Sequence, residues 1–289
     1  MKKRIITGAV LITLCVPIGI YSGTLAFPIV VAALSMIGIF EMYRCIGLSG
    51  RLPLLLPALL IGGGMPMLAF FLRQQTMRFF MCLILVAFLY LFYAFSVSLF
   101  SHGALTPESA ALAVTMLLYI TASFSSIVLL RHMEFGQYTM YLVFIGAWIT
   151  DIFAYFCGML CGKHKLLPDV SPKKTVEGAL GGVLFCAGAY VLYAFVLSRC
   201  VGVRPAYLAF AGIGVIVSVL SQMGDLLMSL IKRRFGIKDY GKIFPGHGGV
   251  LDRFDSRFAL FSARHIMRFS GCSEKKASES FERKESKKQ

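Results

Sequence analysis

This sequence has few charged residues for its length, and that shortage excludes most soluble proteins. Of its 289 residues only 15% are charged and 57% are hydrophobic, with a mean hydropathy of +0.76. A soluble chain carries about 25% charged residues. The few charges are also unevenly placed, since 22 of the 43 lie in the last 59 positions. The composition therefore argues against a soluble enzyme, a disordered protein or a secreted disulfide scaffold, and it predicts a polytopic membrane protein with a basic C-terminal quarter.

The sequence also lacks the usual marks of nucleic-acid and zinc binding. Despite a net charge of +15, no stretch interleaves Lys or Arg with aromatic residues on a soluble face. Cys157 and Cys161 lie one helical turn apart, but no second pair accompanies them, which argues against a metal site. We expect no nucleic-acid partner, and we assign the excess positive charge mainly to membrane orientation.

Eight apolar runs are present, and each is close to the roughly 20 residues that cross a bilayer core about 30 Å thick. Two of the runs contain one acid each, Asp151 in 138–160 and Asp225 in 205–231. The other six contain no charged residue and cover residues 5–21, 24–40, 52–72, 79–100, 109–130 and 178–198. The sequence therefore predicts an all-α, polytopic integral membrane protein with about eight transmembrane helices (eight to nine, depending on whether residues 258–269 span the membrane or lie on it).

Lys and Arg are distributed asymmetrically between the connecting segments. With the N-terminus in the cytoplasm, the cytoplasmic segments up to Arg257 hold 16 Lys and Arg residues and the external segments hold five. Positive charge accumulates on the cytoplasmic side of membrane proteins. This orientation places the loops 158–177 and 232–257 in the cytoplasm.

The second of these loops combines cations, glycines and acids. Its glycine-rich turn around His247 allows backbone N–H groups to approach an anion closely, and Asp252 and Asp255 share one face of a helical turn. Asp225 precedes the loop inside an apolar run, where a carboxylate costs about 2.5–3.5 kcal/mol and is usually functional. Acids amid many cations indicate a hard divalent cation beside phosphate oxygens. Together these are the parts of a phosphoryl or nucleotidyl transfer site, and its cations are Lys232, Arg233, Arg234, Lys238, Lys242 and Arg253.

The first loop carries a smaller basic segment. The stretch Ser171-Pro172-Lys173-Lys174-Thr175 supplies two lysines and two hydroxyls just before the apolar run that starts at Gly178. A helix N-terminus adds a potential that favours anions. An ordinary helix-capping segment would explain the same residues, so both interpretations stay open here.

The stretch from Ser229 to Asp255 reads S-x-x-K-R-x4-K-D-x-G-x2-F-P-x-H-G-G-x-x-D-R-x-D. It resembles the signature of the phosphatidate cytidylyltransferases, also called CDP-diacylglycerol synthases. The upstream patterns D-x-x-A-Y-x-x-G from Asp151, S-P-K-K-T from Ser171 and Q-x-G-D from Gln222 are similar to further motifs of that family, in the expected order. The resemblance is specific over about residues 151–256, whereas the N-terminal half matches only as a hydrophobic region with several spans.

The resemblance implies the reaction CTP + phosphatidate → CDP-diacylglycerol + pyrophosphate, a step of phospholipid biosynthesis. It implies Mg²⁺ as cofactor and allows a monovalent cation such as K⁺ beside it. It also implies a homodimer in contact with membrane lipids, a polar cavity open to the cytoplasm, and a multi-pass protein of the bacterial inner membrane whose active site faces the cytoplasm.

The family motifs also assign roles to individual residues of this chain. The expected catalytic residues are Asp225, Lys232, Arg233, Lys238, His247, Asp252, Arg253 and Asp255. Among these, the expected metal ligands are Asp225, Asp252 and Asp255. The expected substrate-binding residues are Ser171, Lys173, Lys174, Thr175, Gly248 and Gly249. For His247 we favour an anion contact or a role in the turn over acid–base chemistry.

We divide the chain into three regions on these grounds. Residues 1–137 form an N-terminal membrane-spanning region, and residues 138–257 form a catalytic membrane region with cytoplasmic loops. Residues 258–289 combine an interfacial amphipathic helix, 258–269, with a charged and disordered tail. Similar proteins usually finish with a hydrophobic span at this point, whereas 258–269 is short and basic.

Two other functions remain open at this stage. A CTP-dependent enzyme that acts on another lipid phosphate or on a polyprenol would share the cytoplasmic loops and differ in the bilayer part. An ion-coupled transporter would use Asp151 and Asp225 as ion ligands inside the membrane, but it has no use for the glycine-rich turn followed by two acids.

Overall fold

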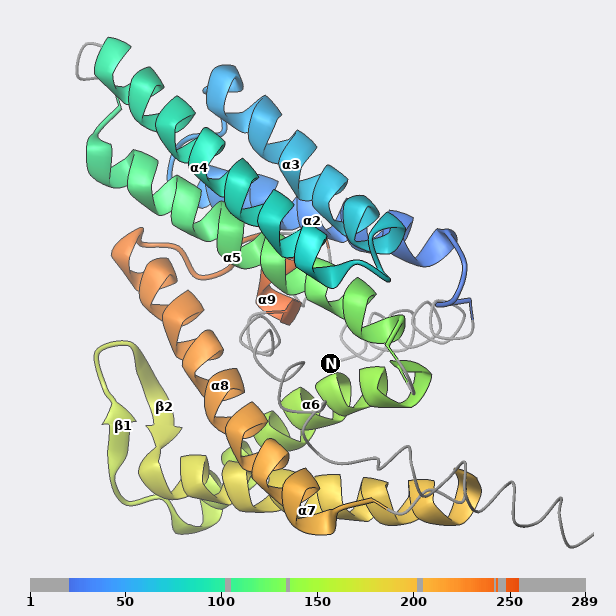
Figure 1. The fold of residues 1–289 in the computed structure, drawn as a ribbon. Coiled ribbons are helices and arrows are strands. Elements are labelled where there is room, and N and C mark those ends of the chain that lie inside the picture. The colour runs from blue at the N-terminus through green and yellow to red at the C-terminus, as the bar shows by residue number, and fades with distance from the viewer. Residues whose placement is uncertain are drawn as a thin grey trace, which may run out of the picture. The chain divides into compact units, whose positions relative to one another are not determined.

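The computed structural model describes residues 21–101, 105–133, 136–201, 205–241, 243 and 248–254, and most of these residues are helical (Figure 1). The predicted span 5–21 and the segment 258–289 lie outside the described residues, apart from Tyr21. The long helices are α2 (Ala26–Cys45), α3 (Leu52–Phe71), α4 (Thr76–Phe100), α5 (Pro107–Arg131), α6 (Gly136–Cys161), α7 (Val176–Val201) and α8 (Tyr207–Arg234). Two short strands, β1 (Lys165–Leu167) and β2 (Ser171–Thr175), and the short helix α9 (Leu251–Phe254) complete the described elements.

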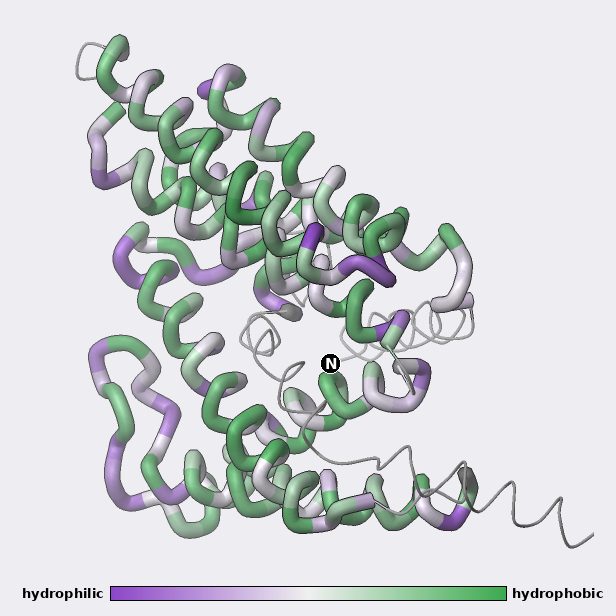
Figure 2. The backbone as a smooth tube through the Cα atoms, viewed as in Figure 1, coloured by the Kyte–Doolittle hydropathy of each residue, from purple (hydrophilic) through white to green (hydrophobic). Residues whose placement is uncertain are grey.

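All seven long helices of the described residues are long and apolar enough to cross a membrane. They coincide with seven of the eight predicted spans, so the prediction of an all-α, polytopic membrane protein is confirmed. Hydrophobic residues dominate these helices, while hydrophilic residues gather at the helix ends and in the hairpin (Figure 2). Pro57 and Pro66 lie inside α3, which membrane helices tolerate because neighbouring groups satisfy the freed backbone.

One helix is longer than the sequence predicts, and the difference bears on function. The predicted run 24–40 ends before the first charged residue, whereas α2 continues to Cys45 and therefore includes Glu41 and Arg44. Glu41 is only 1% exposed. A buried acid in an apolar helix needs compensating donors, and the site described below supplies them.

The described residues form two compact units. The first unit comprises the residues up to Tyr141 and from Met223 onward, and the second comprises Leu142–Gln222. This grouping follows packing and does not separate catalytic from membrane-anchoring residues. The division into regions 1–137, 138–257 and 258–289 therefore stays a prediction.

In the first unit, helices α2, α3, α4 and α5 pack side by side. Helix α5 is largely buried, whereas α4 exposes most of its large apolar side chains, as expected for a surface in contact with acyl chains. A buried hydrogen-bond chain joins three of these helices: the hydroxyl oxygens of Tyr43 and Tyr90 are 2.7 Å apart, and the Tyr90 hydroxyl donates to the Leu54 carbonyl at 3.0 Å.

In the second unit, α6 and α7 approach each other closely through glycines. A Cβ atom at Gly178 would lie 2.5 Å from the Ala154 carbonyl oxygen, and one at Gly182 would lie 3.0 Å from the Thr150 carbonyl oxygen. Small residues at such crossings let membrane helices pack backbone to backbone. Polar side chains add interhelical bonds, since Thr150 donates to Ser218 at 2.9 Å.

Strands β1 and β2 form an antiparallel hairpin between α6 and α7, with Lys165 opposite Thr175 and Leu167 opposite Ser171. The sequence predicts only a loop at this place. The hairpin was missed because its strands have only three and five residues and alternate too briefly to give a clear period-two pattern. It is the only sheet among the described residues.

Candidate functional site

The loop that follows α8 in the first unit returns to its own helix through Tyr240. This side chain is 1% exposed, and its hydroxyl donates to the Met228 carbonyl of α8 at 2.8 Å. Gly236, just after the helix, has a positive φ of 66°, a conformation that glycine adopts without a steric penalty. The chain therefore turns sharply at the end of α8 and folds back along it.

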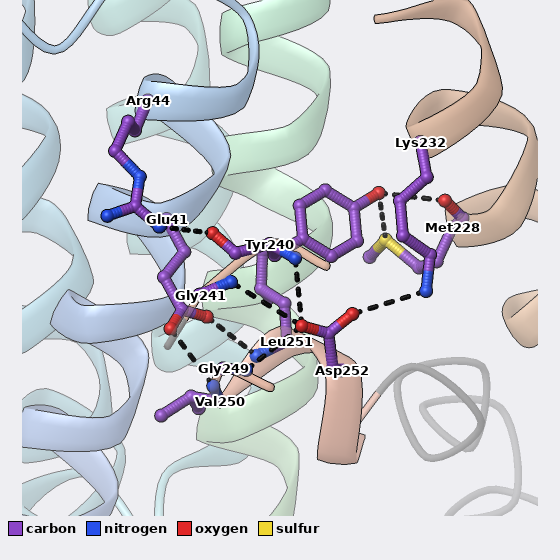
Figure 3. A network of polar contacts seen from close by, with 10 residues as sticks. All are labelled: Glu41, Arg44, Met228, Lys232, Tyr240, Gly241, Gly249, Val250, Leu251 and Asp252. Atoms are coloured by element: carbon purple, nitrogen blue, oxygen red, sulfur yellow. Dashed lines mark hydrogen bonds and ion pairs between the residues drawn. The ribbon is translucent and has the colours of Figure 1, made fainter. Parts of the chain in front are cut away.

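Asp252, in α9, organises the backbone of this loop with one carboxylate oxygen (Figure 3). Its Oδ2 accepts hydrogen bonds from the backbone N–H groups of Tyr240 at 2.8 Å, Gly249 at 2.9 Å and Gly241 at 3.4 Å. Gly248 has φ +85°, and a Cβ atom there would lie 2.7 Å from the same oxygen. One carboxylate oxygen thus holds three separate points of the loop backbone.

The other oxygen of Asp252 faces a cation. Lys232, at the end of α8, places its Nζ 3.2 Å from Asp252 Oδ1. Only 16% of the lysine side chain and 5% of the aspartate side chain are exposed. The Lys232 Nζ also lies 5.4 Å from the centre of the Tyr240 ring, within cation–π range. Because the pair is largely buried, removing either partner would leave a costly uncompensated charge.

Helix α2 holds the same loop from the opposite side, as Figure 3 shows. The Glu41 carboxylate accepts from the backbone N–H groups of Val250 at 3.1 Å and Leu251 at 2.9 Å. One turn further along, Arg44 Nη2 donates to the Tyr240 carbonyl at 2.5 Å. The loop is thus fixed by side chains from α2, α8 and α9.

The second unit carries the other predicted segment, which coincides with β2. Ser171 and Lys174 are half-buried and Lys173 is exposed. Thr175 is buried, and its Oγ1 accepts from the Gly178 N–H at 3.1 Å, which makes it the N-cap of α7. A Cβ atom at Gly158 of α6 would lie 2.8 Å from that hydroxyl. Thr175 therefore caps α7, which is one of the two interpretations that the sequence left open.

Glu177 ties the hairpin to the first turn of α7. Its carboxylate accepts from the backbone N–H groups of Lys163 at 3.1 Å and His164 at 3.2 Å, and His164 Nδ1 lies 2.6 Å from Oε1. These bonds fix the residues just before β1, opposite the end of β2. Lys173 lies in the strand that pairs with β1, and its side chain is exposed.

Among the predicted site residues, the structure brings together Lys232, Asp252, Gly248 and Gly249. Asp225 is half-buried on α8 in the same unit, seven residues before Lys232 and therefore on the same helix face. Arg233, Lys238 and Arg253 are exposed on the same segment. Ser171, Lys173, Lys174 and Thr175 belong to the other unit. His247 and Asp255 lie outside the described residues.

No group of three or more His, Cys, Asp or Glu side chains with metal-site spacing occurs among the described residues. Because Asp255 is not among them, the predicted trio of Asp225, Asp252 and Asp255 stays a prediction.

Sequence reasoning missed Glu41 and Arg44. The available signal was an acid followed three residues later by a base, at the end of an apolar run. An apolar run ends by definition at its first charged residue, so the predicted span 24–40 stops just before Glu41.

Comparison with known proteins covers nearly the whole chain. The family model described as "Cytidylyltransferase family" matches residues 2–270. The phosphatidate cytidylyltransferase of Bacillus subtilis (strain 168) is 32% identical over 265 residues, covering 89% of this chain and 93% of the relative. The protein of the same name from Staphylococcus saprophyticus is 43% identical over 132 residues, covering 46% of this chain and 49% of the relative. Its counterpart in Staphylococcus aureus (strain COL) is 41% identical over 132 residues, with the same coverage.

Proposed function

This chain belongs to the cytidylyltransferase family and transfers the CMP group of CTP to phosphatidate, and we propose that it does so around Asp252 and Lys232 at the end of α8. The products are CDP-diacylglycerol and pyrophosphate, so the enzyme is a nucleotidyltransferase of phospholipid biosynthesis. One observation supports the placement most directly: a nearly buried Lys–Asp pair in a glycine-rich loop at the end of an apolar helix. A purely structural loop would not require a nearly buried ion pair together with further cations and several glycines along the same segment.

The membrane placement agrees with a lipid substrate. The apolar helices make the chain an integral membrane protein, and its similar proteins are bacterial. We propose the cytoplasmic membrane, with the site on the cytoplasmic side. The support is the excess of Lys and Arg in the segments assigned to the cytoplasm and the cationic end of α8, which carries Lys232, Arg233 and Arg234.

Carboxylate oxygens of this kind suit a hard divalent cation. Asp252 commits Oδ2 to the loop backbone, so a metal cation would use Oδ1 and would share it with the ammonium group of Lys232 or displace that group. We propose that Asp225, Asp252 and Asp255 would hold Mg²⁺, with K⁺ as a further candidate beside it. When bound, Mg²⁺ would neutralise phosphate charge.

The chain's own residues then have a positioning and charge-neutralising task. A phosphatidate oxygen attacks the α-phosphorus of CTP, a new P–O bond forms, and the bond from the α-phosphorus to the bridging oxygen breaks to release pyrophosphate. The second pKa of a phosphate monoester is about 6, so the attacking group is largely dianionic at neutral pH and needs no strong base. The obstacle is the repulsion between two polyanions, which cations reduce.

We assign that neutralisation to the cations of both predicted segments. These are Lys173, Lys174, Lys232, Arg233, Lys238 and Arg253. We do not assign individual cations to individual phosphates. Ser171 and Thr175 are further candidates for substrate contact, and the turn that contains His247, Gly248 and Gly249 is assigned to the nucleotide. A homodimer in contact with membrane lipids completes the proposal and is tested by the mass of the purified protein in detergent.

The decisive experiment supplies purified protein in lipid vesicles with labelled CTP and either phosphatidate or a polyprenyl phosphate. We expect a labelled liponucleotide and pyrophosphate only with phosphatidate, and only when Mg²⁺ is added. Product from the polyprenyl phosphate alone would favour the alternative lipid substrate. Turnover that persists in excess chelator would remove the metal from the proposal.

A further inference from the structure

Glu41 is a buried acid that the family motif does not include. It lies in α2, nearly 200 residues before the loop, and only 1% of it is exposed. An acid inside an apolar helix is costly unless donors compensate it. Here the donors are the backbone N–H groups of Val250 and Leu251, directly before Asp252. The carboxylate therefore fixes the backbone from which the Asp252 side chain extends.

The glycines on either side of the loop make room for this carboxylate. A Cβ atom at Gly249 would collide with Glu41 Oε1 and lie 2.5 Å from both Cδ and Oε2 of Glu41. A Cβ atom at Gly241 would also collide with Glu41 Oε1. Neither glycine is among the described residues with a positive φ, so the backbone itself does not require glycine there. Close packing against Glu41 explains why both positions lack a side chain.

Arg44 holds the other end of the same segment. Its guanidinium donates to the Tyr240 carbonyl, while Glu41 binds the backbone at Val250 and Leu251. Two side chains of α2, one helical turn apart, therefore hold both ends of the stretch 240–251, which contains Gly248 and Gly249. Both ends of this stretch are set by α2 rather than by the loop itself.

We propose that Glu41 is a positioning residue for the transfer reaction, which sets the place of Asp252 and of the glycine turn relative to the substrates. Its burial keeps it from touching substrate, so it acts through the backbone it binds. The proposal rests on the placement of the reaction at this loop. It gives helix α2 an indirect part in catalysis, through the loop backbone.

The first test compares Glu41→Gln with Tyr43→Phe. The glutamine keeps the shape of the side chain. Its NH₂ group, however, faces one of the two backbone N–H groups, and because two donors cannot bond each other, the loop must shift. The phenylalanine removes a buried hydrogen bond from the same helix, to Tyr90, without touching the loop. We expect Glu41→Gln to lower kcat by about 10–100-fold, since small misplacements cost that much, with the KM for CTP changed by less than about threefold because a displaced Asp252 impairs the transfer step more than nucleotide binding.

Thermal melting of both variants separates positioning from general stability. We expect both to melt at lower temperature, with kcat of the folded protein reduced only in Glu41→Gln. A kcat for Glu41→Gln no lower than that of Tyr43→Phe would overturn the positioning role. Activity of the wild type and of Tyr43→Phe in the same assay shows that the reaction itself is correctly assigned. An inactive wild type would instead remove the reaction, and the positioning role with it.

A double-mutant cycle keeps the proposal testable if Glu41→Gln is poorly folded. We expect Gly249→Ala to lose activity because its Cβ collides with the Glu41 carboxylate. In a Glu41→Ala background that collision is gone, so adding Gly249→Ala should reduce kcat by less than about threefold. If the double variant instead showed the product of the two single-variant losses in kcat, the two residues would act separately, which contradicts the proposal.

Discussion

The loop around Asp252 and the β1–β2 hairpin both carry lysines predicted to bind phosphate, but the two regions are built differently. In the loop, the carboxylate of Asp252 has a predicted chemical task and also accepts hydrogen bonds from three backbone N–H groups. In the hairpin, Thr175 and Glu177 hold the backbone, while the side chain of Lys173 is exposed. Asp252 thus combines a structural task with a predicted chemical one, whereas Lys173 has a predicted chemical task while other side chains hold the backbone of its strand.

Asp252→Asn should have the largest effect, because it disturbs both tasks at once. The amide removes the charge that pairs with Lys232, and its NH₂ group, which only donates, cannot accept from the backbone N–H groups or from the lysine ammonium. We expect kcat to fall by about 10³-fold or more, with membrane insertion unchanged. Turnover of labelled CTP and the yield of protein in washed membranes measure the two effects. Near-normal activity would remove Asp252 from the metal site and from the chemistry.

Lys173→Ala should have an intermediate effect, because it removes a cation while the strand stays anchored. A charge-assisted hydrogen bond contributes about 1.5–3 kcal/mol, so we expect kcat/KM for CTP or phosphatidate to fall by about tenfold or more. Lys163→Ala is the matched control, since its backbone N–H rather than its side chain bonds Glu177. Equal losses in the two variants would show that β2 does not bind substrate in the predicted way.

Thr175→Val should have the smallest effect on turnover and should act mainly on stability. The valine has nearly the same shape but no hydroxyl, so the Gly178 N–H loses its partner. We expect a loss of about 1 kcal/mol in unfolding free energy, seen as a melting temperature about 2–4 °C lower. Thr175→Ser, which keeps the hydroxyl, is the control. A loss of turnover far beyond the loss of folded protein would show that Thr175 also contacts substrate.

Particular residues show how far sequence reasoning reaches. Apolar runs predicted the seven long helices of the described residues. This works because hydropathy is summed over consecutive residues, so the cost of exposing apolar surface or of burying charge in a bilayer can be read from the local sequence. The motif predicted that Lys232, Asp252 and Gly249 belong to one site, and the structure places them together. The carboxylate of Glu41 was missed, because no local pattern links position 41 to positions 250 and 251. The hairpin was missed because its strands are very short.

The sequence alone determined that this chain is a helical membrane protein with cationic, acidic and glycine-rich segments suited to two phosphate-bearing substrates. Residue type and spacing are sufficient for that, since they fix hydropathy, charge and backbone freedom. Only the tertiary structure decided which groups hold the loop: the carboxylate of Glu41, the guanidinium of Arg44 and the backbone donors around Asp252. These bonds join residues separated by up to 210 positions. They exist only once the packing of α2 against α9 brings the groups within hydrogen-bonding distance.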